Sequence, residues 1–250
     1  APSSPGTEGG VQVLVLAGGL GTRMRPRTET LPKALVPVAG RPFAERQVEL
    51  LASHGVDDIV FAIAYLGHMI RDVLGDGSRW GVSIRYVDEG ERRRGTGGAT
   101  RLFIDSGLAD DDFAVLYGDS YLPIDYRAVW DAYAGCGLPA LMTLVRNHDR
   151  WDTSNASLDG EGRVRYRKGG GVEAGLNYID YGLSVVSASV VSERIPHGAV
   201  SDLAELFYDL GERGLLGGFE VSERFYEVGS EAGIADLEEM LARGTGAHRP

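Results

Sequence analysis

A glycine-rich loop followed by two cations is the part of this sequence best suited to chemistry. The apolar run 11–16 leads into LAGGLGTRMRP at 16–26. Glycines let backbone N–H groups converge on an oxyanion without a Cβ in the way, and a helix beginning there would add its dipole. Arg23 and, ten residues later, Lys33 supply a planar fork and a point charge for phosphate oxygens. The segment therefore predicts a phosphate-binding loop.

Two better-known glycine loops do not match this segment. The dinucleotide pattern G-x-G-x-x-G would need glycine where Met24 stands, and an acidic residue at the end of the second strand, where Tyr65 stands. The P-loop pattern needs Gly-Lys-Ser/Thr, whereas Gly21 is followed by Thr22 and Arg23. The loop is thus predicted to bind phosphate in another way.

Alternating strands and helices are predicted to position this loop. Strands are expected at 11–16, 58–65, 82–87 and 113–117. Helices are expected at 42–54, 66–74 and 95–106. This alternation indicates a mostly parallel, doubly wound, Rossmann-like α/β sheet. Ligands of such sheets bind at the carboxyl ends of strands, so the glycine loop and Asp119 are expected at the same rim.

After Pro139 the pattern changes. Further strands are predicted near 140–145, 156–158, 163–168 and 178–186. Because little helix separates them, we expect a small antiparallel excursion in the C-terminal half of the chain. A helix at 201–213, a strand near 225–228 and an amphipathic helix at 234–241 complete the pattern. We predict one domain over 11–242, a disordered tail at 1–10 and a flexible tail at 243–250.

Composition excludes several classes of partner. The 250 residues include 25 basic and 36 acidic ones, giving a net charge of −11, which argues against nucleic-acid and anionic-membrane surfaces. No segment approaches the ~18 consecutive apolar residues of a membrane span, and the first ten residues lack the features of a signal peptide. The single cysteine, Cys136, excludes an internal disulfide and cysteine-based zinc sites, and fits a cytoplasmic location.

The order of motifs resembles the sugar-1-phosphate nucleotidylyltransferases, also called nucleotide-sugar pyrophosphorylases. After LAGGLGTRMRP and LPK come GTGGAT at 95–100, YGDS at 117–120, YIDYG at 178–182 and YEVGS at 226–230. The resemblance implies a glycosyltransferase-A-like α/β fold. It also implies an enzyme that joins a sugar 1-phosphate to a nucleoside triphosphate, forming a nucleotide sugar and pyrophosphate. The chain is most similar to two small branches, the heptose-1-phosphate guanylyltransferases and the N-acetylmuramate-1-phosphate uridylyltransferases.

The resemblance also implies roles for individual residues. Nucleotide binding would fall to Leu16, Ala17, Gly18, Gly19, Gly21, Thr22 and Arg23, with Gly97 and Gly98 allowing close approach of the base or ribose. Arg23, Lys33 and Asp119 would be catalytic, with Lys33 on the triphosphate. Asp119 and Glu227 would hold the cofactor Mg²⁺, although the family usually has Asp at position 227. Lys168, Asp180 and Gly182 would bind the sugar phosphate.

Lys168 has a second argument. Period 2 along the predicted strand 163–168 places it on the same side as Val164 and Tyr166, which is expected to face the core. A lysine on that side, at a cleft, suits the phosphate of a sugar phosphate. Arg167 stands where the family has Glu before its lysine.

Each assignment has a structural alternative. The glycine loop would then be a plain turn, and Asp119 would cap a helix. Glu227 would end a solvated strand, and Lys168 would lie in a solvated loop. We interpret the run Arg92–Arg94 as a solvated charged loop, with ligand contact as the alternative.

Alternatives also remain for the function. We favour GTP and a heptose-type 1-phosphate over a uridylyltransferase, or one for another base, acting on a hexose or N-acetylmuramate 1-phosphate. A non-catalytic nucleotide-sugar-binding regulatory protein is an alternative of another class. The expected partners are the two small-molecule substrates, without nucleic acid or membrane, and a homodimer is left open.

Overall fold

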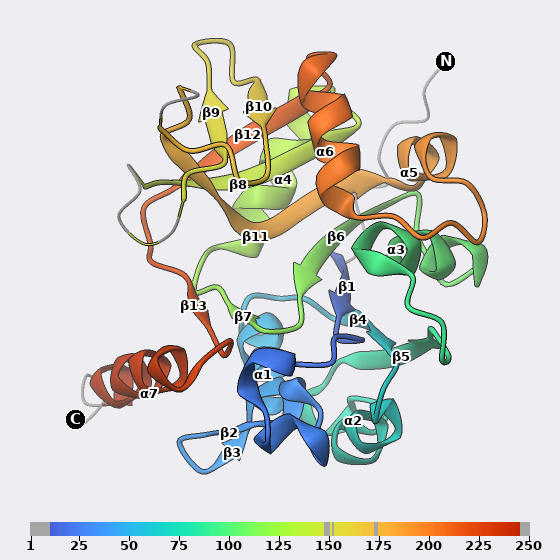
Figure 1. Cartoon of the computed structure of the whole chain (residues 1–250), viewed down its shortest axis with the longest axis vertical. Helices are drawn as coiled ribbons and strands as arrows, with labels where there is room; N and C mark the ends of the chain where they lie inside the picture. The colour runs from blue at the N-terminus through green and yellow to red at the C-terminus, as the bar shows by residue number, and fades with distance from the viewer. Residues whose placement is uncertain (1–10, 148–150, 152, 173–174, 246–250) are drawn as a thin grey trace.

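Within the part of the chain that the structure describes, nine strands form one mixed sheet through the centre of the protein (Figure 1). The computed structural model describes residues 11–147, 151, 153–172 and 175–245. The strands of the sheet are β1 (Gln12–Leu16), β4 (Asp58–Ile63), β5 (Ser83–Asp88), β6 (Asp112–Tyr117), β8 (Ala140–Arg146), β9 (Ala156–Leu158), β10 (Val164–Tyr166), β11 (Tyr178–Ser187) and β12 (Leu216–Val221). Their order is β10-β9-β11-β6-β1-β4-β5, with β8 also paired to β11 and β12 paired to β8.

The sheet has a parallel half and a mixed half. Strands β5, β4, β1 and β6 are parallel neighbours, an order in which the first strand lies at the point where the winding reverses. Strand β11 is antiparallel to β6, β8 and β9, and β10 is antiparallel to β9. The predicted mostly parallel, doubly wound sheet with an antiparallel excursion is confirmed.

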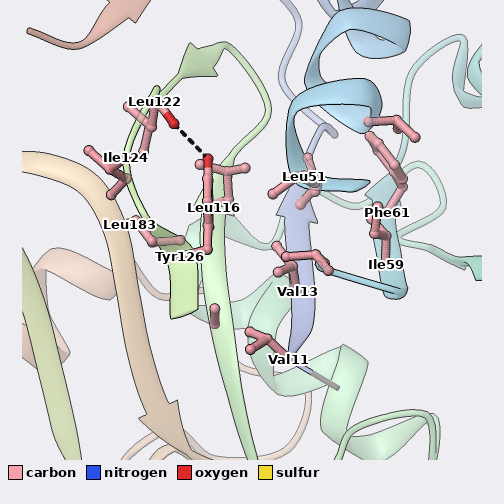
Figure 2. Packing of buried hydrophobic residues seen from close by; sticks show 14 of the residues in the cluster. Val11, Val13, Leu51, Ile59, Phe61, Leu116, Leu122, Ile124, Tyr126 and Leu183 are labelled. Carbon is pink, nitrogen blue, oxygen red and sulfur yellow. Dashed lines mark hydrogen bonds between the residues drawn. The ribbon is translucent and has the colours of Figure 1, made fainter. Parts of the chain in front are cut away.

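Helices cover both faces of this sheet. One face carries α1 (Phe43–Ser53), α2 (Gly67–Leu74) and α4 (Tyr126–Cys136), and the other carries α3 (Gly95–Asp105), α5 (Ala188–Arg194) and α6 (Leu203–Glu212). Successive side chains of a strand point to opposite faces, so Val13 of β1 packs in the first cluster and Leu14 in the second. Figure 2 shows part of the first cluster, where the Tyr126 hydroxyl donates to the Leu122 carbonyl at 3.1 Å.

A third, smaller cluster packs the last helix against the segments that follow β1 and β6. It joins α7 (Glu231–Thr245) to two short antiparallel strand pairs, β2 (Pro37–Val38) with β3 (Arg41–Pro42) and β7 (Ser120–Tyr121) with β13 (Tyr226–Glu227). Figure 1 shows α7 at the edge of the molecule, directly after β13. Helix α7 continues to Thr245, three residues past the predicted domain end at 242. Of the predicted tails at 1–10 and 243–250, residues 1–10 and 246–250 lie outside the described residues.

The local structure departs from the sequence predictions at several places. Strand β12 and helix α5 were not predicted, and Ser120 begins the short strand β7 rather than a helix capped by Asp119. No α-helix begins at the glycine loop, which is followed by the 3₁₀ turns η1 (Thr22–Met24), η2 (Arg27–Glu29) and η3 (Lys33–Leu35). A fourth turn, η4 (Ser78–Trp80), precedes β5. Prolines 26 and 32 separate these turns, since a residue before proline is pushed out of the helical region.

None of the helices in the described ranges has both the length and the apolar composition needed to cross a membrane.

Candidate active site

A cavity of about 850 Å³ lies at the carboxyl ends of β1, β4, β5 and β6. Segments that follow all four parallel strands contribute to its wall, as expected for a ligand site in a doubly wound sheet. The sequence-predicted residues that line it are Leu16, Ala17, Gly18, Gly19, Gly21, Thr22, Arg23, Lys33 and Asp119. The phosphate-loop candidates, both cations and one metal-ligand candidate therefore face the same space.

The glycine loop has a backbone that other residues would not adopt. Gly21 has a φ of +60°, and a Cβ there would lie 2.9 Å from Cγ2 of Thr28. The Thr28 hydroxyl donates to the Gly21 carbonyl at 2.8 Å, which fastens the loop to η2. Nothing lies within 4 Å of a Cβ built at Gly19, so the backbone is open to a ligand at that position. The tyrosine hydroxyl of Tyr65, after β4, donates to the Glu29 carbonyl at 2.9 Å and adds a second anchor.

Two of the three predicted catalytic residues, Lys33 and Asp119, form an ion pair with each other. Both are partly buried, with 15% and 27% of their side chains exposed. The Gly118 N–H donates to the Leu16 carbonyl at 3.0 Å, so the loop carrying Asp119 is bonded directly to the end of β1. In this state Lys33 is the counterion of the Asp119 carboxylate, and both charges lie within reach of a ligand in the cavity.

The second metal-ligand candidate, Glu227, lies beside Asp119 but outside the cavity wall. Pairing of β13 with β7 places Glu227 opposite Ser120, and the Val228 N–H donates to the Asp119 carbonyl at 2.9 Å. Glu227 is exposed. Over the described residues, no group of three or more histidine, cysteine, aspartate or glutamate side chains could hold a metal ion. Magnesium is usually bound through one or two carboxylates together with substrate phosphates, and two neighbouring carboxylates fit that donor set.

Gly97 and Gly98 pack against another segment of the chain. Both are buried at the start of α3, and their N–H groups donate to the Ser201 carbonyl at 2.9 and 3.2 Å. A Cβ on Gly98 would lie 2.5 Å from the Ala199 carbonyl oxygen. These glycines thus allow close packing of the 199–201 segment, and neither lines the cavity. Thr96 and Ala99 do line it.

The period argument for Lys168 was wrong, because β10 ends at Tyr166. Val164 and Tyr166 are buried as predicted, but Lys168 lies in a turn with 70% of its side chain exposed. Its ammonium is 2.6 Å from a carboxylate oxygen of Asp202, and the other oxygen accepts from the hydroxyl of Thr96 at 2.8 Å. Lys168 is therefore linked to the cavity wall through Asp202.

Asp180 and Gly182 lie behind the cavity, at a bulge in β11. The pairing register of β11 with β8 shifts between Asp180 and Ser184. Gly182 has a φ of +103°, and its N–H donates to the Asp180 carboxylate at 2.9 Å. Burial raises the pKa of Asp180 to about 6. A Cβ on Gly182 would lie 3.6 Å from the ring of Tyr117, which lines the cavity, so the bulge is one side chain away from it.

Sequence reasoning missed Glu89, which lines the cavity directly after β5. A Cβ on Gly18 would lie only 2.2 Å from Oε1 of Glu89, so the carboxyl packs onto the glycine loop. Burial raises its pKa to about 7, against a lowering by nearby Arg94. The rule that strand ends meet at the site could have found it, since Asp88 and Glu89 follow the predicted strand 82–87.

The arginine run after Glu89 also lies at the cavity. Arg92, Arg93 and Arg94 all line its wall, rather than forming a loop that faces only solvent. Arg92 and Arg93 are exposed, and the Arg94 guanidinium donates to the Glu89 carbonyl at 3.4 Å. The placement favours the ligand-contact alternative for this run.

Comparison with known families identifies the chain. The model of the nucleotidyl transferase family matches residues 12–154, which include the glycine loop, Lys33, Glu89 and Asp119. The chain belongs to the nucleotidyl transferase family. The family resemblance predicted from the sequence is thereby confirmed.

Several nucleotidyl transferases with different bases are similar to the chain. The UTP–glucose-1-phosphate uridylyltransferase of Synechocystis is 29% identical over 82% of this chain and 56% of its own length. The N-acetylmuramate α-1-phosphate uridylyltransferase of Neisseria meningitidis is 29% identical over 92% of this chain and 98% of its own length. The mannose-1-phosphate guanylyltransferase of Mycobacterium tuberculosis is 31% identical over 75% of this chain and 52% of its own length. The chain thus spans about half the length of the first and third relatives.

Solved nucleotidyl transferase structures share the fold. HddC from Yersinia pseudotuberculosis, solved in complex with GMP-PN, has a TM-score of 0.74 at 23% identity, covering 92% of this chain and 99% of HddC. The inositol-1-phosphate CTP transferase from T. maritima has a TM-score of 0.75 at 19% identity, covering 93% and 95%. At these identities the likeness shows the fold alone.

Proposed function

We propose that this nucleotidyl transferase joins a sugar 1-phosphate to a nucleoside triphosphate, forming a nucleoside diphosphate sugar and pyrophosphate. The observation that carries the proposal is that one cavity of about 850 Å³ holds the glycine loop, Arg23, Lys33 and Asp119 together. A glycosyl phosphate and a triphosphate both need cations and backbone N–H groups around them, and this cavity offers both.

The reaction needs charge neutralisation and alignment more than proton transfer. A phosphate monoester has a second pKa near ~6, so the attacking oxygen is already ionised at neutral pH. A bond forms from that oxygen to the α-phosphorus, and the bond from the α-phosphorus to the bridging oxygen breaks, with its electron pair leaving on pyrophosphate. Arg23, Lys33 and the loop N–H groups would bind the phosphates and offset the developing negative charge.

Asp119 and Glu227 are the residues we propose to hold Mg²⁺. When bound, the ion would supply Lewis-acid stabilisation of the phosphate oxygens. Lys33 pairs with one carboxylate oxygen of Asp119, and its ammonium would bind the triphosphate when Asp119 holds the ion. Lys168, Asp180 and Gly182 remain our candidates for the sugar-phosphate side, with Tyr117 between the bulge and the cavity.

Glu89 supports the preference for GTP. A carboxylate offers two acceptors in one plane, which complement the N1–H and exocyclic N2–H₂ donors on one edge of guanine. The corresponding edge of uracil or thymine has one N–H donor flanked by carbonyl oxygens, which a carboxylate repels. Arg92 and Arg93, on the same wall, could donate to the acceptor edge of guanine. HddC, solved with GMP-PN, has the same fold over nearly its whole length.

A grid of substrates tests the proposal. Pyrophosphate release is measured with Mg²⁺ for ATP, CTP, GTP, TTP and UTP, each against heptose, mannose, glucose and N-acetylmuramate 1-phosphates, with D119N as the blank. We expect turnover with a heptose-type 1-phosphate and GTP. Turnover with another pair would retain the reaction and correct the substrates. Folded protein that binds nucleotide but releases no pyrophosphate anywhere on the grid would favour the regulatory alternative.

A further inference from the structure

Gln47 is a buried glutamine that bonds to both sides of the loop carrying Asp119. It lies in the middle of α1, with 1% of its surface exposed, and does not line the cavity. Its side-chain amide nitrogen donates to the Ser120 carbonyl at 2.8 Å and to the Tyr117 carbonyl at 3.2 Å. One planar amide group therefore spans the two residues between which Gly118 and Asp119 lie.

The other contacts of this loop involve β1, β13 and Lys33 rather than α1. The Gly118 N–H is bonded to the end of β1, and the Asp119 carbonyl accepts from β13. Lys33 contacts the Asp119 carboxylate itself. Gln47 is the only side chain of the described residues for which we find donation to both the 117 and the 120 carbonyl. Because the two bonds flank Asp119, they restrict the backbone rotations that aim its carboxylate into the cavity.

The side-chain amide of Gln47 is used on one side only. The side-chain oxygen of Gln47 is buried and has no hydrogen-bond partner among the described residues. A buried acceptor without a partner lowers stability. A methionine of similar shape would remove that loss, but it would also remove both donors and leave the Tyr117 and Ser120 carbonyls without these bonds. Among the described residues, the two donated bonds of Gln47 go only to the loop of the proposed metal ligand.

We propose that Gln47 is a positioning residue that fixes Asp119 for metal and phosphate binding. The inference rests on the proposed function, since it assigns Gln47 to the same reaction. The amide holds the Tyr117–Ser120 backbone in one arrangement both when Lys33 is paired with Asp119 and when the carboxylate is free to bind the ion. Loss of the amide would leave the carboxylate in place but with more than one orientation.

The test measures metal binding without turnover. Mn²⁺ is titrated against the protein with GTP and no sugar phosphate, and the bound ion is followed by water-proton relaxation. In Q47M, which keeps the side-chain volume but removes both donors, we expect a loss of Mn²⁺ affinity of about 10- to 100-fold, as for other residues that orient a metal ligand. Steady-state turnover should show a lower kcat with a nearly unchanged KM for GTP.

A matched control separates positioning from general destabilisation. Gln12 is also fully buried and donates to the Asp58 carboxylate at 2.6 Å and the Leu108 carbonyl at 3.1 Å, but it lies at the other end of β1. Q12M should lower the melting temperature and leave Mn²⁺ affinity unchanged. Q47E, which when buried and protonated keeps one of the two donors, should fall between the wild type and Q47M.

The outcomes are distinguishable. Wild-type Mn²⁺ affinity in folded Q47M and Q47E would overturn the role of Gln47 while leaving the metal site standing. An equal loss in Q12M and Q47M would also overturn it, because destabilisation alone would then account for the effect. If D119N binds Mn²⁺ as tightly as the wild type, the proposed metal site is wrong, and this inference with it.

Discussion

The proposed contact of Glu89 with guanine predicts that replacing Glu89 by glutamine shifts the base preference away from GTP. The wild-type carboxylate presents two acceptors beside Gly18, whereas the glutamine amide presents one acceptor and one donor in the same shape. One acceptor beside one donor matches the N3–H and neighbouring carbonyl of uracil or thymine. E89Q therefore loses one bond to guanine and gains one to a pyrimidine.

The size of the effect follows from the geometry of a bidentate contact. A well-formed bidentate pair gives about 1–3 kcal/mol of discrimination between bases. This corresponds to a change of about 5- to 150-fold in the ratio of kcat/KM for GTP to that for UTP. Since the site is partly open to solvent and Arg94 stays beside residue 89, we expect a value toward the lower end of this range.

The pH dependence gives a second signature of the same contact. Because burial raises the pKa of Glu89 to about 7, its carboxyl is increasingly protonated below that pH and loses one acceptor. The wild-type ratio of kcat/KM for GTP to UTP should then fall as pH is lowered through about 7. Ionisation of the sugar phosphate changes kcat/KM for GTP and kcat/KM for UTP by the same factor, so it cancels in their ratio. E89Q should show no such fall.

The assay is pyrophosphate release with GTP and UTP at saturating sugar 1-phosphate, between pH 5.5 and 8.5. The control is E91Q, which neutralises another acidic residue of the same cavity two positions along the chain and should leave the ratio unchanged. An E89Q ratio equal to that of the wild type, or an equal shift in E91Q, would refute the role of Glu89 in base selection.

Four further predictions concern the site and its supports. D119N should abolish turnover and keep the wild-type circular dichroism spectrum, so measurable turnover would count against the metal assignment. G21A should lower the unfolding free energy by about 1–2 kcal/mol, because the backbone of Gly21 is in the left-handed region. G19A should have the unfolding free energy of the wild type but a higher KM for nucleotide. Urea unfolding and steady-state kinetics check both variants. K168M should raise the KM for sugar 1-phosphate alone, and an unchanged KM would remove Lys168 from the site. Because the pKa of Glu89 rises from an ordinary 4.5 to about 7, the folded state favours its protonated form, and the unfolding free energy of the wild type should fall from about pH 4.5 to about pH 7 relative to that of E89Q; parallel curves would contradict this.

The parallel half of the fold could be predicted from local sequence alone. The strand 58–63 has a continuous apolar run at 59–63, because both faces of a parallel sheet are covered by helices. The rule that ligands bind at the carboxyl ends of such strands then brought the glycine loop and Asp119 to one rim, where the cavity lies. The same rule extended to 82–87 would have reached Glu89.

Strand β12 and helix α5 could not be predicted, because they depend on tertiary contacts that the local sequence pattern does not reveal. Strand β12 contains Gly217 and Gly218, which suggest a turn, but a Cβ on Gly218 would lie 2.5 Å from Cδ1 of Leu158. Gly218 therefore leaves the room that a residue of strand β9 fills. Helix α5 is short and contains Val190 and Val191, so its sequence resembles a strand.

Lys168 and Gly98 show the same limit within the site. The alternation of buried and exposed residues was predicted correctly up to Tyr166, where β10 ends. Lys168 lies in the turn that follows, so its side chain is exposed instead of facing the core. Gly98 needs to be glycine because of the Ala199 carbonyl, which comes from a segment about a hundred residues later in the chain. A glycine motif therefore indicates a close approach without telling what approaches.

The central claim is that the cavity joins a sugar 1-phosphate to a nucleotide with loss of pyrophosphate. The most direct measurement is a ³¹P NMR time course of the wild-type protein with Mg²⁺, GTP and a heptose-type 1-phosphate, with D119N run in parallel. We predict that a pair of diphosphate resonances from the nucleotide sugar and the pyrophosphate resonance grow together, one nucleotide sugar for each pyrophosphate, and that D119N forms neither. Release of orthophosphate without a nucleotide sugar, or equal product formation by D119N, would contradict the account.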